Sequence, residues 1–225
     1  MSGGKDSVNK MSCIGKSKST SGCGATAPVS KLQTFQDLID DYNKNYRDRL
    51  IAELDLTNCP DYAVCGVNVR LDNTKNPPVY VVDSSPNVHQ YHLKKPVKTG
   101  CTNALKQDNI MSKKFNDFEE LFDHIVDLFK PYFKNIGLAH YDTAKRIGWH
   151  MNPKVLPQKY VYIFCGAETG LQNLIGNGVI CASDYDRKNH RIPTSELQKI
   201  FPGMDSLFIE DMLCIYKDQL KNIKK

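Results

Sequence analysis

Apolar residues recur at intervals of three and four positions in three stretches of the chain, and each stretch predicts an amphipathic helix. In the first, Thr34 and Asp37 have the spacing of a capping box, so a helix should begin there and run to about Leu54. Its charged face should lie in solvent. Together the helices predict a core that includes Phe122, Ile125, Phe129, Ile147, Leu213 and Tyr216.

The second stretch predicts a helix over residues 118–129, capped by Asn116 and ended by Pro131. A tight turn at Gly137 follows it, and a new apolar helical face then runs to about Gly148. A helix, a short glycine turn and another helix therefore follow one another directly.

The third stretch predicts a C-terminal helix that begins near Ser206. Proline-containing breakers interrupt residues 58–114, where the pattern predicts mainly loops and a short strand at 79–82. The apolar run at 160–165 is rich in β-forming residues and predicts a second strand, with the start of a buried helix as the alternative. The expected fold class is mainly α, with α+β as the alternative. It should be one compact helical domain over 32–225 with one or two short strands.

Residues 1–31 have no apolar periodicity and are rich in Ser, Thr, Gly and Lys, which predicts a disordered tail. The tail contains Ser-Gly-Gly-Lys-Asp-Ser at Ser2 to Ser7, the string of the ATP pyrophosphatase phosphate loop. Such a loop needs a buried strand before its glycines and a helix after them. Neither is predicted here, so the string is expected to be part of the tail.

The net charge of +5 is unevenly distributed along the chain. Residues 1–31 carry five Lys and one Asp (+4), and residues 217–225 carry four Lys and one Asp (+3). The body at 32–216 holds the remaining 21 basic and 23 acidic residues (−2), which argues against a broad phosphate-tracking surface. No apolar run approaches the roughly 20 residues of a membrane helix, and no secretory signal is recognised. A cytoplasmic protein with no membrane partner is expected.

Eight cysteines raise the question of a metal site. None are paired as Cys-x2-Cys, the spacing that lets one turn present two thiolates to zinc. We therefore expect free thiols, no metal site and no cofactor.

Three segments resemble a family of uncharacterised, mainly bacterial proteins. They are IGLAHYDTAKRIG (136–148), KYVYIFCG (159–166) and EDMLCIYK (210–217), and the His89-Gln90 pair also matches. The family pattern is approximately G-I-G-x-L-T-x-Y-D-T-A-x-R-I-G, V-Y-L-H-x-G-T-x-x-G and E-D-x-L-C-I-Y-K. The chain departs from it at Asn135, Ala139 and Phe164, where Gly, Thr and His are usual. The resemblance implies one fold over 32–225 and implies no activity.

A first functional hypothesis is binding of the DNA backbone by a helix-hairpin-helix-like turn at 133–147. Lys134-Asn135-Ile136-Gly137 resembles the Gly-hydrophobic-Gly turn of such hairpins, and Asn tolerates the left-handed conformation that the first glycine adopts. Backbone N–H groups at the helix start would hold phosphate, with Lys134, Lys145 and Arg146 adding charge. Nucleic acid is the partner this hypothesis implies. The alternative is a plain helical corner.

A second hypothesis is an enzyme whose cleft is built from His89, Tyr141, Asp142 and the loop 165–170. The first three are acid–base groups, and Cys165 before a helix start would be an activated thiol or a structural cysteine. A third hypothesis is a non-catalytic protein-interaction module of unknown partner. The sequence leaves all three open.

Overall fold

The fold is mainly α, as the sequence predicts. A computed structural model describes residues 32–58, 60–85 and 90–223, and in them it has nine α-helices and two two-stranded sheets. The predicted tail 1–31, its Ser2–Ser7 string and His89 lie outside the described residues.

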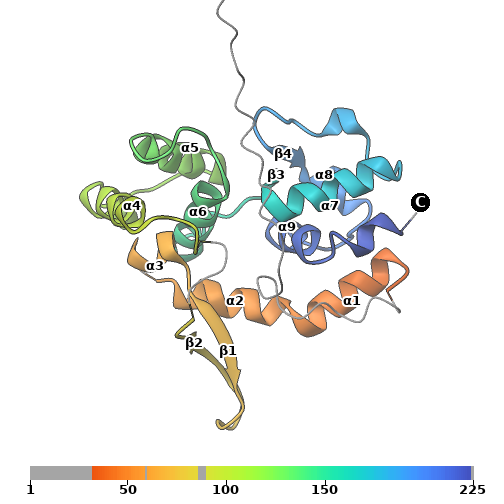
Figure 1. Cartoon of the computed structure of the whole chain (residues 1–225), viewed down its shortest axis with the longest axis horizontal. Coiled ribbons are helices and arrows are strands. Elements are labelled where there is room, and N and C mark those ends of the chain that lie inside the picture. Colours follow the sequence, from red (N-terminus) through yellow and green to blue (C-terminus); the bar gives the residue numbers. More distant parts are fainter. Residues whose placement is uncertain (1–31, 59, 86–89, 224–225) are drawn as a thin grey trace, which may run out of the picture.

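The first predicted helix is two helices, α1 (Phe35–Asn45) and α2 (Arg47–Leu56). The expected capping box is present: Thr34 Oγ1 accepts the N–H of Asp37 at 3.1 Å, and the N–H of Thr34 donates to Asp37 Oδ2 at 2.9 Å. The single helix is wrong because Tyr46 leaves the helical conformation, with φ −127° and ψ −36°. The break lets α2 continue toward the other half of the molecule (Figure 1).

A β-hairpin follows the short helix α3 (Pro60–Cys65) and projects from the body (Figure 1). Strand β2 (Val79–Asp83) was predicted, whereas its antiparallel partner β1 (Asn68–Asp72) was not. The register places Val69, Leu71, Tyr80 and Val82 on one face, because alternate residues point to the same side. Leu71 and Val82 are largely exposed there, so the hairpin is amphipathic.

Three helices complete the half that contains α3. They are α4 (Lys95–Gln107), α5 (Phe118–Phe129) and α6 (Leu138–His150), with a 3-10 turn η1 (Ile110–Ser112) between the first two. Helix α4 corrects the prediction of loops in this region. The predicted cap of α5 is wrong by one residue, since Asp117 Oδ1 accepts the N–H of Glu120 at 3.0 Å.

The other half is formed by the last third of the chain. It contains the paired strands β3 (Tyr160–Tyr162) and β4 (Arg191–Pro193) and the helices α7 (Cys165–Gly176), α8 (Thr194–Gln198) and α9 (Ser206–Ile215). Two 3-10 turns, η2 (Ala182–Asp184) and η3 (Gln219–Lys221), complete it. Helices α7 and α9 pack so closely that a Cβ at Gly170 would lie 2.2 Å from the carbonyl oxygen of Leu213.

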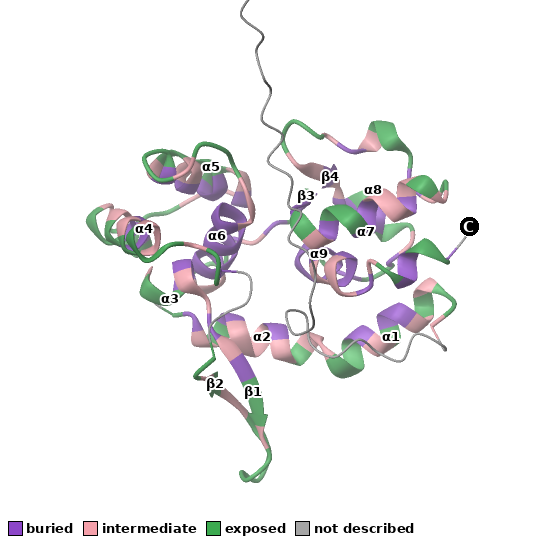
Figure 2. Cartoon of the chain, in the orientation of Figure 1, coloured by how far each residue is buried: buried purple, intermediate pink, exposed green. Residues whose placement is uncertain are grey.

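Buried apolar residues form two clusters, and Figure 2 shows buried helical segments in both halves of the molecule. The central cluster is built from residues between 63 and 164, and the terminal cluster combines residues 38–54 with residues 161–223. Successive residues in and just after β3 contribute to both clusters: Val161 and Ile163 belong to the terminal cluster, Tyr162 and Phe164 to the central one. The six core residues predicted from the sequence are all buried.

Candidate functional site

Helix α6 and the turn before it carry seven of the nine candidate site residues. The helix lies on the side of its half that faces the other half of the molecule (Figure 1), and every residue from Ala139 to Gly148 is buried (Figure 2). The turn is exposed at Lys134, Asn135 and Ile136. The two ends of the predicted site therefore have opposite environments.

The turn differs from the predicted geometry at Asn135. The described non-glycine residues with positive φ are Asn109, Cys165 and His190, so Asn135 is not left-handed. Gly137 is the N-cap of α6 with an extended backbone at φ −164° and ψ −174°. A Cβ built on Gly137 would meet no described atom within 4 Å, which means that the space beside the turn is open.

Among the described residues, no side-chain oxygen caps the start of α6. Gly137 has no side chain to accept the first N–H groups, and its own N–H donates to Nδ1 of His140 at 3.2 Å. The N–H groups of Leu138 and Ala139 belong to the first turn, which has no intrahelical acceptor. They form, with the positive end of the helix dipole, a site that favours anions.

His140 should make the stability of the protein depend on pH. Burial lowers the pKa of His140, and the Gly137 N–H donates to the unprotonated Nδ1 of its ring, a bond that protonation of this nitrogen would break. Below about pH 6.5 this histidine binds a proton in the unfolded chain more readily than in the folded chain. The free energy of unfolding therefore falls as the pH is lowered. Above that pH the effect is absent.

The measurement is the difference in melting temperature between about pH 8 and about pH 5. The melting temperature of the wild type should be lower at the acidic pH, and we expect this decrease to be smaller in His140→Gln. His92→Gln is the matched control, because His92 is exposed. An equal decrease in the wild type and in His140→Gln would show that His140 does not contribute.

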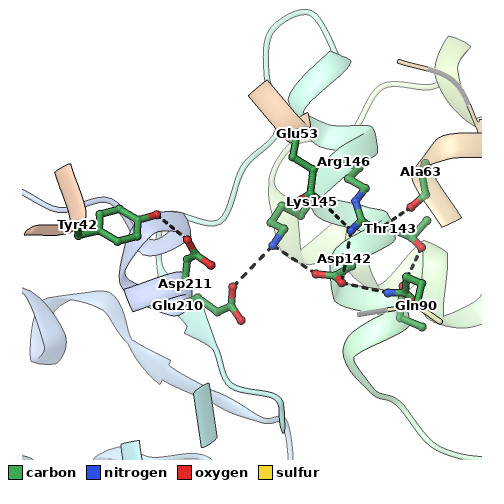
Figure 3. A network of polar contacts seen from close by, with 11 residues as sticks. Tyr42, Glu53, Ala63, Gln90, Asp142, Thr143, Lys145, Arg146, Glu210 and Asp211 are labelled. Atoms are coloured by element: carbon green, nitrogen blue, oxygen red, sulfur yellow. Dashed lines mark hydrogen bonds and ion pairs between the residues drawn. The ribbon is translucent and has the colours of Figure 1, made fainter. Parts of the chain in front are cut away.

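The middle of α6 forms a buried network of charges (Figure 3). Asp142 lies at its centre, with one carboxylate oxygen 3.3 Å from Lys145 Nζ and the other 3.6 Å from Arg146 Nη2. Gln90 Nε2 donates to Asp142 Oδ2 at 3.0 Å, which ties the segment before α4 to the helix. Asp142 is 1% exposed on its side chain, so these contacts lie in a low-dielectric environment.

The network connects α6 to both halves of the molecule. Arg146 Nη2 lies 2.9 Å from Glu53 of α2, and its Nη1 donates to the carbonyl of Ala63 of α3 at 3.1 Å. Lys145 Nζ lies 3.7 Å from Glu210 of α9. Charges from three helices, α2, α6 and α9, and a carbonyl of α3 are thus held together where the two clusters meet.

This placement corrects the prediction that Lys145 and Arg146 contact phosphate. Both are buried, and both are paired with carboxylates inside the protein. Burial alone would lower the pKa of Lys145, but Asp142 and Glu210 outweigh it and hold the pKa above its usual value. Lys145 therefore stays protonated as a structural cation.

Tyr141 is packed among rings and does not face a cleft with Asp142. Its ring lies 6.0 Å from Phe118, 5.5 Å from Tyr162 and 6.0 Å from Phe164, measured between centroids. Its hydroxyl is buried and has no hydrogen-bond partner among the described residues. Burial, followed by the charge of Glu210, raises the pKa of Tyr141 well above its usual value, so Tyr141 is not a base near neutral pH.

The predicted loop 165–170 is the beginning of helix α7. Cys165 is its first residue, is exposed and has a positive φ of 46°. The adjacent Phe164 ring stacks on His190 at 5.1 Å. Of the four candidates of the enzyme hypothesis, Tyr141 and Asp142 are immobilised in the interior, Cys165 is at the surface, and His89 is outside the described residues.

Sequence reasoning missed Glu53 and Glu210 as partners of α6 and gave Gln90 no role. Glu53 lies on the face of the first predicted helix that was assigned to solvent. Its pairing with Arg146 spans 93 positions and has no local signal.

No group of three or more His, Cys, Asp or Glu side chains in the described part of the chain is arranged to hold a metal. No helix in that same part is both long enough and apolar enough to cross a bilayer. Comparisons with protein-family models, with curated proteins and with solved structures find no match to the chain. Its function is therefore inferred from the geometry of its own residues.

Proposed function

We propose that the protein binds the phosphate backbone of duplex DNA, independently of sequence, through the turn between α5 and α6. The observation that carries the proposal is the turn Lys134–Gly137, exposed at residues 134–136, which opens a 13-residue helix whose first N–H groups have no oxygen cap among the described residues. Phosphate oxygens are acceptors of the kind that such a helix start binds. Contacts of this type fix a protein on DNA without reading bases.

The open space beside Gly137 supports a close approach of phosphate to the backbone. A side chain at this position would stand in that space without touching the protein. Lys134 is exposed next to the turn and adds a positive charge.

In this proposal the lysines at the start of α4 supply the additional positive charge that the sequence had assigned to Lys145 and Arg146. Helix α4 lies against the turn, since a Cβ at Gly100 would be 2.3 Å from a ring carbon of Tyr132. Lys94 and Lys95 are exposed at the start of the same helix. The surface would be small, in agreement with the net charge of −2 over residues 32–216.

Gly137→Val should weaken DNA binding without affecting the fold. The extended backbone of Gly137 suits a β-branched residue, and the new methyl groups would fill the space that phosphate needs. We expect the dissociation constant for a mixed-sequence duplex to rise about tenfold, as for the loss of one charge-assisted hydrogen bond. Fluorescence anisotropy at low salt measures it, and a thermal melt verifies folding.

Lys134→Ala should lower affinity evenly across sequences and reduce the slope of log K against log salt by about one. Lys188→Ala, an exposed lysine in the loop before β4, is the matched control and should bind as the wild type does. Absence of duplex binding by the wild type at low salt would end the proposal. So would a Gly137→Val protein that is folded and binds normally.

A further inference from the structure

A cavity of about 620 Å³ opens where the two halves of the molecule meet. It is lined by α2, by the end of α6 with residues 154–158, by α8 and by the start of α9. Small-molecule sites have volumes of about 300–1,000 Å³ and often lie between structural units. The cavity is at the opposite end of α6 from the proposed DNA-binding turn, about 18 Å away along 12 residues of helix.

The lining combines apolar side chains with polar groups. Its apolar part comprises Ile51, Trp149, Leu156, Pro157, Leu207 and Phe208. The hydroxyl groups of Thr194 and Ser206 also line it and are already paired, at 2.7 Å from one another. These hydroxyls are held in place before any ligand enters.

Two cations line the cavity without an acidic partner. The guanidinium of Arg47 lies 4.6 Å from the centroid of the Phe208 ring, and Lys154 Nζ lies 3.2 Å from that of Trp149. In the described part of the chain neither makes an ion pair, and Arg47 Nη1 donates only a long hydrogen bond of 3.4 Å to Asn43 Oδ1 there. This contrasts with Lys145 and Arg146, which carboxylates neutralise.

One acidic residue, Asp205, also lines the cavity. It is the exposed N-cap of α9, and its side chain does not cap the helix. Its carboxylate disfavours an anion at that end, whereas Arg47 and Lys154 favour one. Arg47 and Lys154 together contribute +2 and Asp205 contributes −1, so the net charge of the lining is +1.

We propose that this cavity binds a small molecule that carries an oxyanion on a flat apolar ring. The planar guanidinium of Arg47 pairs with carboxylate, sulfonate or phosphate oxygens in a two-pronged geometry, and its ring contact with Phe208 pre-orients it. The apolar lining takes the ring. Both parts of the ligand thus have their own recognition surface.

The probe is 1-anilinonaphthalene-8-sulfonate, and its matched control is N-phenyl-1-naphthylamine, which has the same rings without the sulfonate. Trp149 is the single tryptophan of the chain and lines the cavity. Energy transfer from Trp149 to either dye reports binding close to the cavity, and the lining variants given below locate it. The titration uses the full chain under conditions where a cooperative melt shows it to be folded.

We expect the sulfonate to bind at least about tenfold more tightly than the neutral dye, as for the gain of charge-assisted hydrogen bonds. Arg47→Gln and Lys154→Gln should each weaken sulfonate binding and leave the neutral dye unchanged. Asp205→Asn should strengthen sulfonate binding, and Lys188→Gln should change nothing.

Equal binding of the two dyes would overturn the proposal. Sulfonate binding that neither Arg47→Gln nor Lys154→Gln weakens would overturn it too, as would an absence of energy transfer from Trp149. Lys154 is exposed, so its replacement tests the site even if the Arg47 variant unfolds.

Discussion

Replacing Arg146 with methionine should lower the free energy of unfolding by about 3–5 kcal/mol, the effect of removing one partner from a buried ion pair. Methionine fills much of the same volume but leaves Asp142 and Glu53 with less compensating charge. The carbonyl of Ala63 also loses its donor. Urea unfolding followed by circular dichroism measures the change.

The control is Arg187→Met, because Arg187 is exposed in the loop before β4 and its replacement should alter stability by less than about 0.5 kcal/mol. The double variant Arg146→Met, Asp142→Asn should be less destabilised than the sum of the two single variants, since each removes the other's unpaired charge. A loss below about 1 kcal/mol in Arg146→Met would show that the network does not hold α6 in place.

Leu213→Ala should lower the free energy of unfolding by about 2–5 kcal/mol. Leu213 is fully buried in the terminal cluster on α9, and the backbone contact between its carbonyl and Gly170 prevents α7 from closing the space. The measurement is again urea unfolding.

Met111→Ala serves as the comparison, because Met111 is 37% exposed and little packing is lost with it. If Leu213→Ala changed stability by less than about half a kcal/mol, α9 would not be docked as described.

The elements that the sequence predicted well are those whose apolar residues follow a helical period, such as α5 and α9. Helix α4 was missed because its segment, KPVKTGCTNALKQ, has few apolar residues, although Cys101 and Leu105 are fully buried. The break at Tyr46 was missed because the apolar period continues through it. Tertiary contacts decided both cases.

The candidate site was harder to predict for a physical reason. Lys145 and Arg146 look like solvent-facing residues in isolation, since charged side chains on a helix usually are. Their burial depends on carboxylates supplied by α2 and α9, which no local pattern encodes. The turn at Lys134–Gly137 is a local feature, and its place at a helix start followed from the sequence, whereas the exposure of residues 134–136 did not.

The composition of the two clusters has a consequence for how the chain acquires its structure during synthesis. The central cluster is continuous in sequence and can form as soon as residue 164 has been made. Helix α1 must wait for partners such as Phe208, which follows Tyr42 by 166 positions. At about 5–20 residues per second, the apolar face of α1 remains uncovered for about 8–33 seconds on each ribosome. During that time Leu38, Ile39 and Tyr42 are open to chaperones and to aggregation.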